Sequence, residues 1–166
     1  MGNERLTHLD EQGRARMVDI GDKPASERRA VASGCLVMSA STLDLVLAGK
    51  VPKGNVIEVA RIAGIQAAKR TAELIPLCHT LPLSHVGVDV EADANGLRVT
   101  ATASTTAATG VEMEALTAAA IGLLTLYDMC KAIEKGMRVV NLRLEEKTGG
   151  RSGTWVRTET EKSASQ

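Results

Sequence analysis

The stretch VGVDVEADANGLRVTATA, residues 86–103, decides the fold of this chain. Apolar residues occupy every second position from 86 to 90 and again from 97 to 103, which is the period of a β-strand that buries one face. Between the two runs, Asn95-Gly96 is a residue pair typical of a tight hairpin turn. We therefore expect two antiparallel strands joined at this turn.

Elements on both sides of the hairpin complete the expected fold. Small and apolar residues within 28–38 and alternation within 139–145 predict two more strands. Capping residues predict three helices: 42–48 with Ser41 as the cap, 55 to about 75 from the capping box Asn55/Glu58, and 109 to about 134 from the capping box Thr109/Glu112. With the short helix taken as an insertion, this order predicts an α+β, ferredoxin-like split βαβ fold, an antiparallel sheet with helices packed on one face.

The 166 residues suit one catalytic domain, over 28–157. We expect an N-terminal arm over 1–27, a flexible basic loop over 147–153 and a disordered tail over 158–166, because these segments are polar or rich in glycine. Three cysteines without CxxC spacing favour a reducing compartment, with no disulfide framework and no zinc site. No apolar run approaches the roughly 20 residues of a membrane span, and the start lacks a signal-peptide core. We expect a cytoplasmic protein.

Composition argues against one class of partner. The net charge is +0 and aromatic residues make up only 1% of the chain. Nucleic acids are bound through many basic contacts on one face, and single strands through stacked aromatic side chains. A ferredoxin-like RNA-binding module is therefore disfavoured, and any anion site must be local.

Asp128 and Lys131 give the sharpest chemical signal. They are three positions apart on the longest expected helix, so their side chains share a face and can exchange protons with a bound ligand. An exposed ion pair without function has the same spacing. Apolar neighbours such as Tyr127, Met129 and Ile133 favour the functional interpretation, since charges in apolar surroundings usually have a role.

Two glutamates open the same helix. Glu112 belongs to the expected capping box, and Glu114 suits the positive end of the helix dipole. Glu114 and Asp128 are fourteen residues apart, so they share a face but are separated by about 21 Å at roughly 1.5 Å per residue. One small ligand cannot easily touch both. We therefore predict a symmetric homo-oligomer in which this helix approaches an antiparallel copy through its small residues 117–122, with sites at the interface.

Three loop features could bind an anion or move a proton. His79 lies in a loop that two prolines stiffen, Lys53 precedes a helix N-terminus, and residues 149–153 form a glycine-rich turn like a phosphate-binding nest. Each feature is also compatible with an ordinary polar loop. Cys78 has no evident cationic neighbour that would activate its thiol, so it is not expected to act as a nucleophile.

Four long motifs occur in a fixed order: ARIAGIQAAKRT at 60–71, LIPLCH at 74–79, TGVEMEALT at 109–117 and LYDMCKA at 126–132. Met17-Val18-Asp19 and Lys53-Gly54-Asn55 are shorter matches, the latter with Asn where the family more usually has Asp. Together they resemble the cyclic pyranopterin monophosphate synthase family, the C proteins of molybdenum-cofactor biosynthesis, over roughly residues 7–156. Ordered motifs of this length are highly specific.

The resemblance implies a lyase that converts 3′,8-cyclo-7,8-dihydroguanosine triphosphate to cyclic pyranopterin monophosphate and pyrophosphate. It implies a homohexamer, a trimer of dimers with sites at dimer interfaces. We expect no cofactor and no metal-binding residues. By position, Asp128, Lys131 and Lys53 match the catalytic residues. Residues that match the substrate-binding segments, or are weaker candidates for lining the site, are Leu77, Cys78, His79, Glu112, Met113, Glu114, Arg28, Lys69, Lys147 and Arg151.

In the implied mechanism, hydrolysis opens the imidazole ring of the purine, a pyrazine ring closes, and a sugar hydroxyl attacks the innermost phosphorus. The catalytic residues transfer protons, while His79 and basic residues offset the charge of the triphosphate. The chain has Ala107-Ala108 where the family often carries glycine and a polar or basic residue, a loop variation that could remove one phosphate contact. The alternative is a non-catalytic regulatory domain that binds an anion or nucleotide and in which Asp128 and Lys131 are only structural.

Overall fold

The computed structural model describes residues 12–151 and 153–158. Its elements, in chain order, are β1 (Ser26–Val37), α1 (Ala40–Leu47), α2 (Val56–Ala68), α3 (Thr71–Leu74), β2 (Leu83–Asp93), β3 (Gly96–Ala107), α4 (Glu112–Cys130), β4 (Arg138–Thr148) and β5 (Trp155–Val156).

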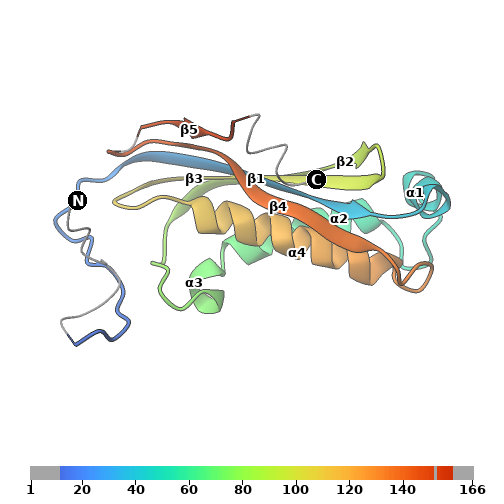
Figure 1. Ribbon diagram of the computed structural model, residues 1–166, viewed down its shortest axis with the longest axis horizontal. Coiled ribbons are helices and arrows are strands. Elements are labelled where there is room, and N and C mark those ends of the chain that lie inside the picture. Colours follow the sequence, from blue (N-terminus) through green and yellow to red (C-terminus); the bar gives the residue numbers. More distant parts are fainter. Residues whose placement is uncertain (1–11, 152, 159–166) are drawn as a thin grey trace.

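The strands form one sheet in the order β2-β3-β1-β4-β5, and each neighbouring pair is antiparallel. Because β3 lies between β1 and β2, and β1 lies between β3 and β4, the chain contains two interlocked split βαβ units. The long helices α2 and α4 pack on one face of this sheet (Figure 1). The α+β, ferredoxin-like fold expected from the sequence is confirmed.

The hairpin of β2 and β3 has the predicted register. Asp93 pairs with Gly96 at the turn and Val90 pairs with Val99. The alternating apolar side chains of both strands are buried beneath α2 and α4, where they join fully buried leucines of β1 and α4 in the core. The strand pattern therefore identified the face that the helices cover.

The first two helices differ from expectation at their ends. Ser39, not Ser41, caps α1, because its hydroxyl accepts the backbone N–H of Thr42. Asn55 caps α2 as predicted, by accepting the N–H of Glu58. However, the helix that was expected to reach residue 75 ends at Ala68, and α3 follows as a separate turn. The hydroxyl of Thr71 donates to the carbonyl of Ala68 at the break.

The predicted capping box of α4 is wrong. Val111 is the N-cap residue, and its apolar side chain makes no capping bond. The Glu112 carboxylate accepts a hydrogen bond from Lys147 of β4 at 2.9 Å. The α-helix ends at Cys130 rather than near Glu134, although turns continue beyond it.

The C-terminal region is more regular than expected. Lys147 and Thr148 end β4 instead of opening a loop, and β5 pairs with this strand. The alternation of β4 is interrupted at Asn141, which has a φ of 55° where the register with β1 shifts. Residue 152 of the expected loop, residues 1–11 of the expected arm and residues 159–166 of the expected tail lie outside the described residues.

The expectation that no segment is long and apolar enough to span a membrane is wrong for α4. Its 19 residues pass that test by length and composition. However, Ala115, Leu123 and Leu126 have no exposed surface, and the helix packs on α2 and the sheet. A core helix passes the same test, and burial among these elements identifies α4 as one.

The small residues in the middle of α4 pack against their own chain. A Cβ atom on Gly64 of α2 would lie 2.8 Å from the carbonyl oxygen of Ala118, and one on Gly122 would lie 3.3 Å from Val99 of β3. Close approach is therefore needed between α2, α4 and the sheet. The prediction that residues 117–122 present small side chains to a second copy is not supported, because most of them are buried within the chain.

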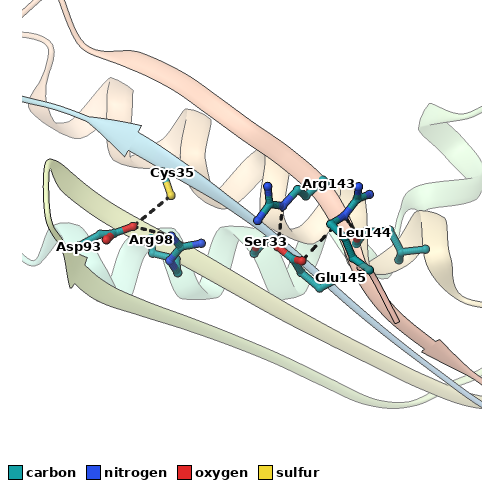
Figure 2. Close-up of polar contacts among 8 residues, drawn as sticks. Ser33, Cys35, Asp93, Arg98, Arg143, Leu144 and Glu145 are labelled. Carbon is teal, nitrogen blue, oxygen red and sulfur yellow. Dashed lines mark hydrogen bonds and ion pairs between the residues drawn. The ribbon is translucent and has the colours of Figure 1, made fainter. Parts of the chain in front are cut away.

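The opposite face of the sheet carries polar clusters (Figure 2). Cys35 lies 3.4 Å from a carboxylate oxygen of Asp93, which also pairs with Arg98. Ser33 donates to Glu145 at 2.5 Å. These contacts satisfy polar groups on the face that the helices leave uncovered.

We predict unequal effects of two glycine substitutions in the helix layer. Gly64→Ala should destabilise the fold by about 1–3 kcal/mol, because the new methyl group meets a backbone oxygen that cannot move freely. Gly122→Ala, the matched control, should be close to neutral, since its nearest contact is a side-chain methyl at 3.3 Å and alanine favours helix. Denaturant unfolding measures both; equal effects would contradict the packing described.

Candidate functional site

The candidate site residues gather at the two ends of α4. Figure 1 shows the N-terminal arm and α3 near the start of this helix and α1 near its end. Asp128, Lys131 and Lys53 lie at the second end, whereas most of the candidate substrate-binding residues line cavities at the first. Because α4 is one continuous helix, the two groups remain about four turns apart within one chain.

The three expected catalytic residues form one ion cluster. Lys53 Nζ lies 2.8 Å from Asp128 Oδ2 and also donates to the backbone carbonyl of Asp128 at 2.8 Å. Lys131 Nζ lies 2.6 Å from Asp128 Oδ1. Each side chain is about half exposed, so a ligand can reach all three. The sequence predicted the pair on α4; the structure adds the contact with Lys53.

The cluster is strongly ionised in the absence of a ligand. Hydrogen bonds from Lys131 and Lys53 lower the pKa of the Asp128 carboxyl to about 2. The bond with Asp128 raises the pKa of Lys131 in turn. At neutral pH the cluster therefore contains a carboxylate between ammonium groups. An anionic ligand that attracts either lysine would raise the proton affinity of Asp128.

A basic cavity of about 640 Å³ lies at the other end of α4. The charged side chains that line it are Lys23, Arg28, Arg29, Glu112, Lys147 and Arg151. The single carboxylate, Glu112, is already paired with Lys147. The turn Gly149-Gly150 packs closely on β1: a Cβ at Gly149 would collide with the backbone carbonyl of Glu27, and one at Gly150 with the guanidinium group of Arg28. The cavity can accept a polyanion through several cations at once.

A second cavity of about 390 Å³ adjoins the first and shares Lys23, Thr109, Gly110 and Glu112 with it. Its other lining residues include the expected substrate-binding set Leu77, Cys78, His79, Met113 and Glu114. The two cavities together form a surface with one strongly cationic part and one part lined by Leu77, Leu81 and Met113 among polar groups, which suits a ligand with a polyanionic tail and a planar head.

The N-terminal arm contributes residues that sequence reasoning missed. His79 Nε2 lies 2.8 Å from the carbonyl oxygen of Val18, so the arm contacts the proline-bracketed loop. Val18, Ile20 and Lys23 line the cavities. The match at Met17-Val18-Asp19 was the available signal, since a polar arm without function would not be expected to match a family motif.

Glu114 and Cys78 have altered acidities. Glu114 is only 4% exposed, and this burial raises the pKa of its carboxyl group. A hydrogen bond from its own backbone N–H lowers the pKa by less, and the negative charge of Glu112 raises it further. Burial and the nearby Glu114 carboxylate raise the pKa of the Cys78 thiol. A thiol with a raised pKa is a poor nucleophile at neutral pH, in agreement with the sequence analysis.

Lys69 is not brought to this site within one chain. It ends α2 and lines a separate cavity of about 500 Å³ with His85. Ala108, at the departure from the family pattern, lines the basic cavity with a side chain that offers no polar group to a ligand.

We predict that Glu114 makes stability depend on pH. Since its folded-state pKa is raised, the folded protein binds protons more tightly than the unfolded chain, so stability falls as pH rises from about 4.5 through the raised value. Glu114→Gln should remove this decline. Urea unfolding at a series of pH values measures it, with Glu91→Gln on β2 as an exposed control; an unchanged profile in Glu114→Gln would contradict the prediction.

The sequence was compared with known proteins. The family model described as the MoaC family matches residues 17–150. Cyclic pyranopterin monophosphate synthase of Chloroflexus aggregans is 56% identical over 158 residues, 94% of this chain and 96% of the relative. Its namesake in Thermomicrobium roseum is 56% identical, covering 94% and 95%. Cyclic pyranopterin monophosphate synthase 3 of Mycobacterium tuberculosis is 57% identical, covering 92% and 86%. The resemblance seen in the motifs is confirmed, and the chain belongs to the MoaC family.

Proposed function

We propose that this protein is a cyclic pyranopterin monophosphate synthase, a lyase of molybdenum-cofactor biosynthesis. Family membership and relatives of this name over nearly the whole chain carry the assignment. Its substrate is 3′,8-cyclo-7,8-dihydroguanosine triphosphate, and its products are cyclic pyranopterin monophosphate and pyrophosphate. The reaction takes place in the cytoplasm, in accordance with the free cysteines and the buried position of the most apolar helix.

The adjoining cavities would divide the substrate between them. The triphosphate lies in the basic cavity, near Arg28, Lys147 and Arg151, whose charges offset the leaving pyrophosphate. The purine-derived head lies along Leu77–His79 and Met113, with the buried Glu114 beside it. Lys69 lines a different cavity, which has Leu81 in common with the cavity that holds the head. Lys69 would therefore contact substrate either in another copy of the chain or where the two cavities meet at Leu81.

The catalytic cluster reaches this substrate from a second copy of the chain. Within one chain, Asp128 is about 21 Å along α4 from Glu114, too far for one ligand of this size to contact both. A two-fold axis that sets two copies of α4 antiparallel brings the end of one helix to the start of the other. We place the outer stripe of α4, which includes the exposed Leu124, at this contact, and a trimer of such dimers gives the hexamer.

Proton transfers are assigned to the ion cluster. Lys131 and Lys53 are ammonium groups in the free protein and can donate protons to the opening imidazole ring or to a leaving oxygen. Asp128 becomes an effective base only when the triphosphate draws the lysines away, since hydrogen bonds from both lower its pKa to about 2. Substrate charge would thus adjust the acidity of the groups that act on it.

The assignment predicts turnover that depends on Asp128. Purified protein incubated with the cyclic dihydroguanosine triphosphate should release pyrophosphate and form the pterin product. Asp128→Asn should fold and bind substrate but lose about 10²–10⁴-fold in kcat, because the amide cannot take up a proton. Chromatographic product detection and calorimetric binding measure the two properties. Absence of both products with the unmodified protein would refute the assignment. An Asp128→Asn variant that binds its ligand and keeps the full function of the protein would favour a regulatory domain.

The shared site predicts complementation between two inactive variants. Asp128→Asn disables one end of α4 and His79→Ala the other, so each variant alone should be nearly inactive. Co-expressed and randomly mixed, they should regain about a quarter of the activity, because half of the dimers are mixed and one of their two sites is intact. Native mass spectrometry verifies that mixed oligomers form. Mixed oligomers without recovered activity would show that one chain supplies the whole site.

A further inference from the structure

Glu134 lies just beyond α4 and makes several bonds that the proposed chemistry does not use. Its carboxylate oxygens accept the backbone N–H of Ser39 at 3.0 and 3.2 Å, and the Ser39 hydroxyl lies 2.8 Å from Oε2. Hydrogen bonds from the side chains of Thr42 and Ser39 lower the pKa of Glu134, so the bonds are charge-assisted at neutral pH. The contact joins residues 95 positions apart in the chain.

Ser39 is connected to the Lys53 turn through α1. It is the N-cap of α1, whose eight residues form a short rigid rod. The chain leaves α1 through Gly49 and reaches the buried Val51, whose carbonyl accepts the N–H of Gly54 in the turn that presents Lys53. A displacement of α1 can therefore be transmitted along this short segment to the turn that carries Lys53.

The other side of the contact is tied to the ion cluster. The N–H groups of Lys131 and Glu134 donate to the carbonyls of Tyr127 and Cys130, so the turn after α4 has a defined geometry. The Tyr127 hydroxyl donates to the carbonyl of Lys135 at 3.0 Å and holds the same turn from its other side. Glu134 is thus fixed relative to Asp128 by the backbone that both share.

These contacts form a closed loop: Glu134 to Ser39, along α1 to Lys53, and back through Asp128 to the end of α4. Within this loop, the bond between Lys53 and Asp128 is a half-exposed ion pair of a long, flexible side chain, a kind of contact that contributes little by itself. The Glu134 contact has more bonds and shorter side chains, which makes it the stronger attachment of α1 to α4.

We propose that Glu134 is a positioning residue that holds α1 and the Lys53 turn against the end of α4, so that Lys53 stays paired with Asp128. This inference rests on the proposed function for its catalytic consequence, but not for its structural one. Glu134 does not touch the proposed substrate; it acts through Lys53.

The structural consequence is tested by the titration of Asp128 in protein labelled with ¹³C at the aspartate side-chain carboxyl, with the signal assigned by Asp128→Asn. Unmodified protein should titrate at about 2. Glu134→Ala should shift the midpoint of the Asp128 titration upward, as Lys53→Met should, while Lys131 keeps it below the ordinary value of an aspartate.

The controls separate this effect from a general one. In the Lys53→Met background, Glu134→Ala should cause no further shift of the Asp128 titration. Glu134→Gln, whose carbonyl can accept the same Ser39 bonds, should stay close to the unmodified protein. Glu91→Ala, an exposed carboxylate on β2, is the control.

The catalytic consequence is a fall in kcat of about 10- to 100-fold in Glu134→Ala with little change in KM, because a catalytic lysine is displaced while the binding cavities are intact. A purely structural role would lower stability without moving the Asp128 titration. An unshifted titration in folded Glu134→Ala overturns the proposal, as does an unshifted titration in Ser39→Ala should Glu134→Ala not fold. Absence of turnover in the unmodified protein would refute the function alone, since the titration is measured without substrate.

Discussion

The packing of α4 on the sheet is the constraint on which the other features of this protein depend. The helix is held by fully buried side chains such as Leu123 and Leu126, and by the close approach that Gly64 and Gly122 permit. Because it is rigid and 19 residues long, it keeps its two ends apart. The cavities at its start and the ion cluster at its end cannot meet within one chain. This separation is the physical reason for proposing that a second copy completes the site.

Charge is distributed unevenly along the same axis. The net charge of the chain is +0, yet cations predominate around the cavity at the start of α4. At the other end, one carboxylate holds two ammonium groups in a compact cluster. A polyanionic substrate placed between these ends, in an oligomer, would compete with Asp128 for the lysines. In the proposed site, this arrangement would link substrate binding to the protonation of Asp128, without a buried charge at the cluster.

Local patterns along the chain predicted much of this fold. The hairpin of β2 and β3, the Asn55 cap and the pairing of Asp128 with Lys131 depend on neighbours within a few residues, and each was found as expected. Two of the errors, at the starts of α4 and α1, lie where a distant group contacts the expected capping region. Glu112 was expected to cap α4, but its carboxylate pairs with Lys147, which is 35 positions away. The local sequence does not distinguish Ser39 from Ser41 as the cap of α1. In the structure Ser39 caps the helix and also bonds to Glu134, which is distant in the sequence.

By itself, the sequence determined the fold class and the family, and it supplied the candidate residues for the proposed chemistry, because periodicity, turns and long motifs are properties of contiguous residues. Only the tertiary structure decided that Lys53 joins Asp128, that the N-terminal arm contacts His79, and that the small residues of α4 are used within the chain. These are contacts between segments brought together by the sheet and its helices. Their partners depend on packing of the whole chain, which no local pattern records.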